Sequence, residues 1–453
     1  MPKPLKAVLV TVLVLVLVTL SGSLAAPAVA RDQDRCSHRT ECTEGRSDRG
    51  NGPARPFRLV APEPTGAYDV GRTTLHLVDA DRRDPWRPND LRELMATVTY
   101  PARHTDRYPR ARWFSAPVAA DLEAQAAQPP LNIDLGPVDL DDARANAHTG
   151  APVTQPGHHR GRDWPVVLFS PGGGTSRELN TALVEDLASR GYVVVSFDHT
   201  YEAPVELPDG RVVPPAPEFL STDVAVLRDT LARAIDVRVA DTRFVLDKLA
   251  ELDRGRNPDA EHRRLPTGLR RSLDLSRVGM LGYSYGGYTA AEAMHDDPRI
   301  DAGINLDGTM AHGLGLPGWP YAPGRAVQNG LDRPFMLVGN QRHNHLAAPP
   351  DAPGDLSWPQ FWANHRGWKL DISLRGSEHG SFADLQSLAP QIADALDLPT
   401  APFHPLIGTI DPDRSIAAQR AYITAFFDLH LRGRDTDLLD RPSRDFPEVQ
   451  IVD

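Results

Sequence analysis

This sequence contains few cysteines and has no net positive charge. Cysteine occurs only at Cys36 and Cys42, close to the N-terminus, and neither is a candidate nucleophile for the 453-residue chain. Lysine and arginine together number 49 against 60 aspartates and glutamates, which gives a formal net charge of −11. This balance, with no basic stripe along the chain, argues against nucleic acid as a partner.

Long apolar runs are absent except at the N-terminus. Lys3 and Lys6 precede one such run, and a small-x-small cleavage site ends at Ala30, so residues 1–30 are predicted to be a signal peptide cleaved after Ala30. The alternative is an uncleaved membrane anchor, because the run is nearly long enough to span a bilayer. No twin arginine precedes the run and no cysteine at the cleavage point accepts a lipid, so the sequence favours secretion by the general pathway.

Residues 31–65 are rich in Arg, Asp, Gly and Pro and are predicted to be a flexible leader. Cys36 and Cys42 lie within it, and in an oxidising compartment they are expected to form a short disulfide loop. His38 between them suggests a metal, but three ligands in a flexible segment make a poor site. A single catalytic domain is predicted over residues 66–453.

Strand-like and helix-like segments alternate along this predicted domain. The strands are expected at 73–79, 93–101, 165–170, 192–199, 277–284, 300–308, 334–341 and 368–377. The helices are expected at 116–128, 177–191, 221–252, 285–295 and 413–433. The alternation predicts an α/β fold with a mainly parallel sheet covered by helices on both faces, and residues 104–163 look like an excursion from that core.

One short segment points to chemistry. The stretch Met280–Ala290, MLGYSYGGYTA, places Ser284 between Gly282 and Gly286. A glycine-rich turn is one interpretation, but the segment joins a predicted buried strand to a predicted helix, which is the context of a nucleophile elbow. The start of the helix also sets backbone N–H groups beside the hydroxyl. Ser284 is therefore the predicted nucleophile.

A serine hydroxyl is a weak nucleophile unless a base removes its proton. In this architecture the acid and the base follow the serine in that order, each after a later strand. The downstream histidines are His295, His312, His343, His345, His365, His379 and His404. Only His379 lies directly after the last strong strand, in a polar turn between glycines, so it is the predicted base.

The orienting acid is identified by position. Its commonest place, after the strand at 334–341, holds no carboxylate before Asp351. The preceding strand ends in Asp307, followed by a glycine, and this aspartate is the predicted acid, although a turn former is the alternative. Asp332 and Asp355 are the weaker substitutes.

Acyl transfer also needs donors for the oxyanion. The backbone N–H of Tyr285, directly after the nucleophile, is one predicted donor, and the second is expected from the glycine-rich loop at 169–174. A phosphate-binding loop is rejected there because no Gly-Lys-Ser/Thr follows. The histidines at 158–159 and 343–345 are interpreted as loop residues, so neither a metal nor a cofactor is expected. Four aromatic residues form either ordinary core or a pocket wall: Trp358, Phe361, Trp362 and Trp368.

These motifs resemble those of the plasma-type platelet-activating factor acetylhydrolases and their secreted bacterial relatives, within the α/β-hydrolases. The matching stretches are LFSPGGGTSRE, VVSFDHTYEA, GMLGYSYGG, INLDGTM and GSEHGSFAD. The resemblance covers roughly residues 66–450 and implies the α/β-hydrolase fold. It assigns Ser284 as nucleophile, Asp307 as acid and His379 as base, with Gly173 and Tyr285 as oxyanion donors. Many relatives have histidine where this chain has Tyr283, and some have histidine in place of Pro171.

The resemblance implies a secreted serine esterase or lipase that cleaves short acyl esters of lipids or simple esters without calcium. A small-molecule or lipid ester is then the expected partner, and transient contact with a lipid surface is compatible with it. Three alternatives stay open: a polyester-degrading hydrolase, a peptidase of the same fold, and a catalytically silent binding protein. A silent protein normally loses part of the triad, and a peptidase usually needs a gating domain that this chain does not supply.

Overall fold

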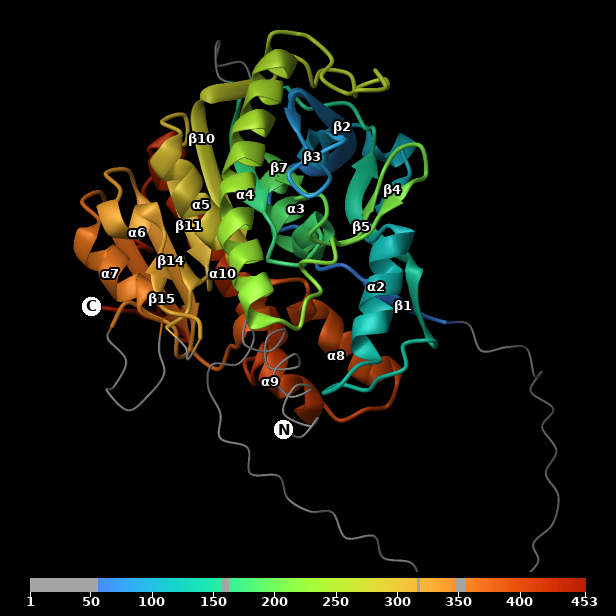
Figure 1. Cartoon of the computed structure of the whole chain (residues 1–453). Coiled ribbons are helices and arrows are strands. Elements are labelled where there is room, and N and C mark those ends of the chain that lie inside the picture. The colour runs from blue at the N-terminus through green and yellow to red at the C-terminus, as the bar shows by residue number, and fades with distance from the viewer. Residues whose placement is uncertain (1–55, 156–162, 316–317, 347–354) are drawn as a thin grey trace, which may run out of the picture.

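A twelve-stranded, mostly parallel β-sheet forms the centre of the protein (Figure 1). The computed structural model describes residues 56–155, 163–315, 318–346 and 355–453. The strands are β1 (Phe57–Val60), β2 (Asp69–Arg83), β3 (Leu91–Ala102), β4 (Arg110–Arg112), β5 (Val138–Thr149), β6 (Trp164–Ser170), β7 (Val193–Phe197), β10 (Leu273–Tyr283), β11 (Ala302–Leu306), β14 (Phe335–Asn340), β15 (Lys369–Leu374) and β16 (Val449–Ile451). Their order is β1-β5-β2-β3-β7-β6-β10-β11-β14-β15-β16, and β4 pairs with β5.

The part of the sheet from β7 to β15 is entirely parallel. Strand β3 joins β7 antiparallel on one side, and β16 joins β15 antiparallel on the other. Because parallel strands end at the same edge, the segments that follow β6, β10, β11, β14 and β15 converge there. All the predicted site residues lie in those segments.

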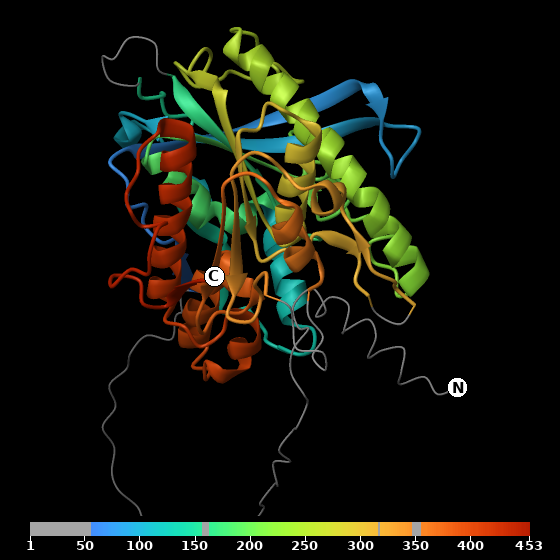
Figure 2. The same cartoon turned by 90° about the vertical axis from the view of Figure 1, so that its left-hand side faces the viewer.

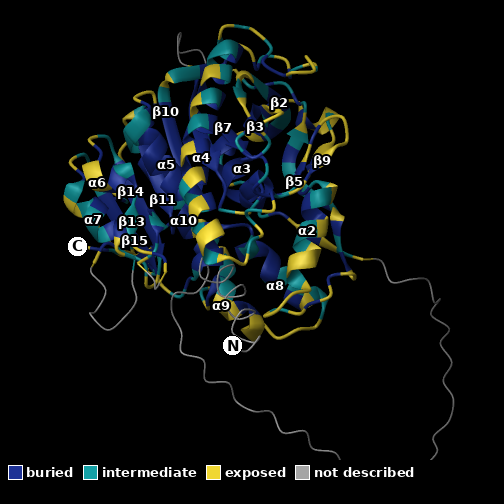
Figure 3. Ribbon diagram, in the orientation of Figure 1, coloured by how far each residue is buried: buried dark blue, intermediate teal, exposed yellow. Residues whose placement is uncertain are grey.

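Helices cover both faces of the sheet, as the sequence predicts (Figures 1 and 2). The long helix α4 (Val224–Asp253) packs with α5 (Tyr285–Asp296) on one face. Helices α3 (Thr181–Ser189) and α10 (Pro412–Arg432) pack on the other face. Figure 2 shows α4 and α10 on opposite sides of the sheet. Figure 3 shows the exposed outer stripe of α4 and the buried strands beneath it.

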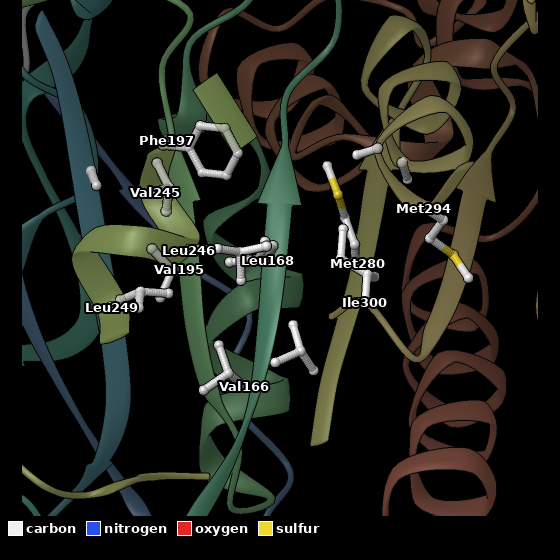
Figure 4. Packing of buried hydrophobic residues seen from close by; sticks show 14 of the residues in the cluster. Val166, Leu168, Val195, Phe197, Val245, Leu246, Leu249, Met280, Met294 and Ile300 are labelled. Carbon is white, nitrogen blue, oxygen red and sulfur yellow. The ribbon is translucent and has the colours of Figure 1, made fainter. Parts of the chain in front are cut away.

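The central strands are apolar on both sides because each side meets a helix layer. In β6, Val166 and Leu168 belong to the cluster under α4, whereas Val167 and Phe169 belong to the cluster under α3 and α10. Figure 4 shows the first cluster, in which Leu246 and neighbouring α4 residues pack on side chains from β6, β7 and β10. Burying each such aliphatic side chain contributes roughly 1.5–3 kcal/mol.

The segment predicted to be an excursion extends the sheet instead. Strand β5, within residues 104–163, pairs in parallel with β1 and β2. Its buried positions include Ala143, Ala145 and Ala147, which alternate with polar residues. The sequence has the period of a strand there, but alanine is too small and too weakly apolar to give a strong signal.

The described fold begins before residue 66. Strand β1 lies inside the predicted leader and pairs with β5. Thr65 donates its backbone N–H and its hydroxyl to the buried carboxylate of Asp186, each at 2.8 Å. The end of the leader is thus part of the fold because it supplies an edge strand. The predicted signal peptide, its cleavage site and the Cys36–Cys42 disulfide lie outside the described residues.

The remaining elements lie outside the central sheet. They are the helices α2 (Ala116–Ala126), α6 (Arg325–Asn329), α7 (Ser357–Asn364), α8 (Leu385–Ala395) and α9 (His404–Ile407), the 3-10 turns η1 (Thr105–Arg107), η2 (Arg177–Asn180), η3 (His379–Phe382) and η4 (Ala401–Phe403), and the short pairs β8 (Val205–Glu206) with β9 (Val212–Val213) and β12 (Ala311–Gly313) with β13 (Ala322–Pro323). In the part of the chain that the structure describes, none of the helices has the length and apolarity to cross a bilayer.

Candidate active site

Ser284 lies at the turn between strand β10 and helix α5. Its φ of 56° and ψ of −123° are strained for a residue with a side chain. The turn is held by its surroundings: the Ser284 amide donates to the carbonyl of Leu306 at 2.8 Å, and its carbonyl accepts from the amide of Gly287 at 2.9 Å. The strand–turn–helix context predicted for a nucleophile elbow is therefore present.

The two glycines beside Ser284 are required by close backbone contacts. A Cβ on Gly282 would lie 2.1 Å from the carbonyl oxygen of Gly286, and a Cβ on Gly286 would lie 1.9 Å from the carbonyl oxygen of Ser170. Both separations are far inside van der Waals contact, and the obstructing atoms are backbone, which cannot move aside cheaply. The spacing of the motif thus has a packing reason.

Gly286→Ala is expected to destabilise the protein by about 3 kcal/mol or more, because the new methyl group forces α5 away from β6. Thermal unfolding checks this, with Gly136→Ala as the control. Gly136 is exposed, and the nearest atom to its Cβ would be a side-chain oxygen of Asp134 at 3.3 Å. Equal melting temperatures for the two variants would contradict the packing argument.

A chain of hydrogen bonds joins Ser284, His379 and Asp307. His379 begins η3, just after β15, and its Nε2 lies 3.0 Å from the Ser284 Oγ. Its Nδ1 lies 2.6 Å from the Asp307 Oδ2. All three side chains are buried. The structure thus brings together the three residues that the sequence predicts, in the order that general-base activation of a serine requires.

Asp307 is held in an unusual backbone conformation directly after β11. Its φ of 57° is left-handed, which points its carboxylate along the edge of the sheet toward the end of β14. There Asn340 donates its backbone N–H to Oδ1 at 2.9 Å and its side-chain amide to Oδ2 at 3.0 Å. Asn340 thus occupies the strand end where an acid is commonest, and it serves as a donor to the acid on the neighbouring strand.

The Asp307 carboxylate has a pKa well below its usual range. Burial by itself raises the pKa of this carboxyl, but hydrogen bonds from His343 and His379 favour the charged form and outweigh the burial. One of these two donors, His343, lies with its Nδ1 2.9 Å from Oδ1, although its sequence context predicts an ordinary loop residue. An ionised acid is what the base needs as a partner.

The weaker candidates for the acid lie elsewhere. Asp332 is exposed, with the Arg333 guanidinium 3.9 Å away. Asp355 lies 2.9 Å from His343 and accepts the backbone N–H of Ser357, the first residue of α7, at 2.7 Å. His345 binds Asp371 and His312 lies near the Tyr288 hydroxyl, so these two histidines contact groups outside the serine–histidine–aspartate chain.

The two predicted oxyanion donors lie side by side. Tyr285 is the first residue of α5, a position where the backbone N–H has no acceptor within the helix. Gly173 lies in the turn after β6, and a Cβ placed on it would be 3.5 Å from the Tyr285 Cβ. The two segments that carry these amides are therefore in contact, as an oxyanion hole requires.

Arg238 of helix α4 supports this region and was not identified from the sequence. Its guanidinium donates to the carbonyls of Pro171 (2.7 Å) and Gly172 (3.1 Å) and lies 4.8 Å from the centre of the Tyr285 ring. It also forms a bidentate pair with Glu202, so the buried charge is compensated. Arg238 follows Ile235 by three positions and therefore lies on the apolar face of α4. A charged residue on such a face indicates a charge that is buried and paired.

A second Ser-His-Asp chain lies deeper in the core. Ser170 Oγ is 2.9 Å from His199 Nε2, and His199 Nδ1 is 3.0 Å from the carboxylate of Asp241. These residues are 0%, 2% and 0% exposed. Burial and the nearby Arg238 charge lower the pKa of His199 to about 4, so the ring is neutral. Ser170 ends a regular strand and has no elbow, which makes this chain an unsuitable nucleophile site.

The ion pairs of Asp241 indicate that the second Ser-His-Asp hydrogen-bond chain has a structural role. Arg92 donates to both oxygens of Asp241, at 3.1 and 2.6 Å, and is itself fully buried. The carboxylate that would orient the histidine is therefore already neutralised by a fixed guanidinium. This network joins β3, β6, the segment after β7 and α4.

The remaining sequence motifs have structural places. Trp358 and Phe361 are fully buried, and Trp358 and Trp362 stack on His343 and His345, so these aromatics are core residues. Trp368 packs on Phe426. His158 and His159 lie outside the described residues. Among the described acidic residues, Asp435, Asp437 and Asp440 are close enough together for a cation, but they are exposed and remote in sequence from the motifs above.

Comparisons with known proteins agree with this geometry. A model of the family described as platelet-activating factor acetylhydrolase, isoform II, matches residues 124–208, which include the loop with Gly173. The probable 1-alkyl-2-acetylglycerophosphocholine esterase of Arthroderma benhamiae is 28% identical over 88% of this chain and 95% of its own length. The platelet-activating factor acetylhydrolase of Bos taurus is 24% identical over 60% of this chain and 58% of its own length.

A solved structure also matches this chain in three dimensions. The ferulic acid esterase from Streptomyces cinnamoneus matches with a TM-score of 0.66 and 34% sequence identity. The match covers 88% of this chain and 100% of the esterase. The shared architecture thus extends over most of the chain rather than over the elbow alone.

Proposed function

We propose that this chain, a carboxylic-ester hydrolase of the α/β-hydrolase fold that is similar to platelet-activating factor acetylhydrolases, uses Ser284, His379 and Asp307 as its catalytic triad. The observation that carries the proposal is the hydrogen-bond chain from Ser284 Oγ through His379 to Asp307, with links of 3.0 and 2.6 Å. The hydrogen-bond chain begins at Ser284, in the strained turn between β10 and α5.

In the proposed reaction, Ser284 Oγ attacks the ester carbonyl while His379 Nε2 accepts the serine proton. The amides of Gly173 and Tyr285 stabilise the oxyanion, and His379 returns the proton to the departing alcohol. Water then releases the acid from the acyl-enzyme by the same route. Asp307 holds the imidazole in the productive tautomer throughout.

The substrate we propose is a small or lipid ester with a short acyl group. The name of the Arthroderma benhamiae relative refers to an acetylglycerophosphocholine ester and that of the Bos taurus relative to an acetylhydrolase, and both support this class. A second candidate is an aryl ester such as a ferulate, because the Streptomyces cinnamoneus esterase is the more similar in sequence, at 34% identity. Polyesters and peptides are less well supported by these relatives.

An activity profile tests the proposal. Hydrolysis of p-nitrophenyl acetate, butyrate, octanoate and laurate should be fastest for the short acyl groups, and a short-chain phosphatidylcholine should be cleaved without calcium. Methyl ferulate, a polyester film and a chromogenic peptide complete the panel. Preference for ferulate would select the second candidate, whereas no turnover of any ester would contradict the catalytic assignment and favour a binding protein.

We also propose that the protein is secreted after removal of residues 1–30. The positive n-region, the apolar run and the small-x-small site support this, and a free Arg31 amino terminus is expected on exported protein. N-terminal sequencing of culture supernatant and membrane fractions checks it. An intact N-terminus found only in membranes would identify the segment as an anchor instead.

A further inference from the structure

Asp307 is shared between two histidines, and the second of them faces another carboxylate. His379 Nδ1 contacts Oδ2, while His343 Nδ1 contacts Oδ1 at 2.9 Å. The other nitrogen of His343, Nε2, lies 2.9 Å from Asp355 Oδ2. An ionised carboxylate only accepts hydrogen bonds, so a ring placed between two of them satisfies both contacts only when both nitrogens carry protons. His343 is therefore an imidazolium ion.

This imidazolium is fixed on every side. Its ring stacks on Trp358 with centroids 3.8 Å apart, and the indole N–H of Trp358 donates to the carbonyl of Gly308, the residue after Asp307. Asp355 is held in turn by the backbone N–H and hydroxyl of Ser357, both at 2.7 Å. The arrangement links the start of helix α7 rigidly to the predicted catalytic acid.

The charges around His343 agree with its protonated state. Burial lowers the pKa of His343, but the bonds to Asp307 and Asp355 raise it to about 10. The Asp307 pKa shifts the opposite way, so the ion pair persists across the neutral range and is lost only as the pH rises toward 10 or falls into the acid range. The other titratable groups nearby are His345, Asp371, His379, Glu378, Arg342 and Tyr321.

The net charge of Asp307, His343 and Asp355 together determines how strongly they attract the protonated form of His379. A lone imidazolium beside Asp307 would cancel the negative charge that His379 faces. Asp355 supplies a further negative charge, so the group of Asp307, His343 and Asp355 keeps a net charge of one negative unit. The acid is thus held on both oxygens without weakening its attraction for the protonated base.

We propose that His343 and Asp355 are positioning residues that orient Asp307 and preserve the charge facing His379. The proposal rests on the proposed function of Ser284, His379 and Asp307. It adds two residues to the hydrogen-bond chain, which then runs from Ser284 to the start of α7. Neither residue touches the reacting atoms, so their effect is expected in kcat and in the pH profile rather than in KM.

The chain offers a matched control on the same loop. His345 also stacks on a tryptophan, Trp362 at 3.9 Å, and also bonds a buried carboxylate, Asp371 at 2.7 Å. It has the same kind of surroundings as His343 but no hydrogen bond to Asp307 among the described contacts. His345→Gln therefore reports what loss of a stacked, paired histidine does to the fold alone.

The experiment compares His343→Gln, Asp355→Asn and His345→Gln, with kcat normalised to the fraction of enzyme that a fluorophosphonate labels. His343→Gln and Asp355→Asn are expected to lower kcat by about 10- to 100-fold with little change in KM, because misorientation of a catalytic group carries a cost of this size. Asp355→Asn should also move the acid limb of kcat/KM downward by on the order of one pH unit, since the base then faces less negative charge. His345→Gln should change neither quantity.

Unchanged kcat and an unchanged acid limb in both His343→Gln and Asp355→Asn would overturn the proposal, as would equal losses in His345→Gln. A measurement on the wild-type protein covers variants that fail to fold: in ¹⁵N-histidine-labelled enzyme at pH 8, one buried histidine should keep both ring protons, and a neutral His343 contradicts the inference. Labelling of a serine other than Ser284 would instead refute the proposed function.

Discussion

Ser284→Ala is expected to lower ester hydrolysis by about 10⁶-fold, because removing a nucleophile that acts together with its base costs roughly that much in turnover. The fold should survive. Ser284 makes its two turn-holding hydrogen bonds through the backbone, and alanine keeps both. Initial rates on a p-nitrophenyl ester, together with the thermal melting curve, measure the two expectations.

Ser170→Ala is the matched control for this substitution. Ser170 also bonds a histidine that bonds an aspartate, but it is fully buried in β6. Its removal should leave activity within about tenfold of wild type, since the substitution removes a buried hydrogen bond to His199 but no residue of the proposed triad. A fluorophosphonate should label Ser284 alone. If Ser170→Ala is inactive and Ser284→Ala is not, the deeper chain is the catalytic one and the assignment fails.

Asp307→Asn should lower kcat by about 10⁴-fold while leaving the geometry nearly intact. An aspartate that holds the base in one tautomer cannot be replaced by an amide, which also presents N–H groups to the ring. The loss is sharpened here because four donors point at this carboxylate: the backbone and side-chain N–H groups of Asn340, His343 Nδ1 and His379 Nδ1. Steady-state kinetics across pH measure the effect.

Asp332→Asn is the suitable control, because Asp332 is exposed and lies near Arg333 only at 3.9 Å. It should remain within a few-fold of wild type. Asp355→Asn is not a neutral control, since Asp355 holds the histidine that binds Asp307. The expected loss of kcat is largest for Asp307→Asn, smaller for Asp355→Asn and smallest for Asp332→Asn. If Asp355→Asn is inactive while Asp307→Asn is healthy, the acid lies on the later loop.

Local sequence patterns were sufficient to predict the tight turn at Ser284 and most of the sheet. Ser284 stands out because Gly282 and Gly286 flank it between a buried strand and a helix, and a turn this tight depends on neighbours only a few residues away. Asp307 and His379 were identified by their places at strand ends. The strands under two helix layers are apolar throughout, so their signal is strong, whereas the alanine-based alternation of β5 was too weak to identify it.

Only the tertiary structure decided what surrounds the acid. His343 and His345 differ by two positions and look equivalent in the sequence, yet one contacts Asp307 and the other Asp371. Asn340, His343 and His379 reach Asp307 across separations of 33, 36 and 72 residues. Such contacts depend on the order of β10, β11, β14 and β15 in the sheet and on the left-handed φ of Asp307. Packing of the whole domain sets both the strand order and this φ. The side chains involved carry no periodic signal of their own, so the sequence alone does not predict their contacts.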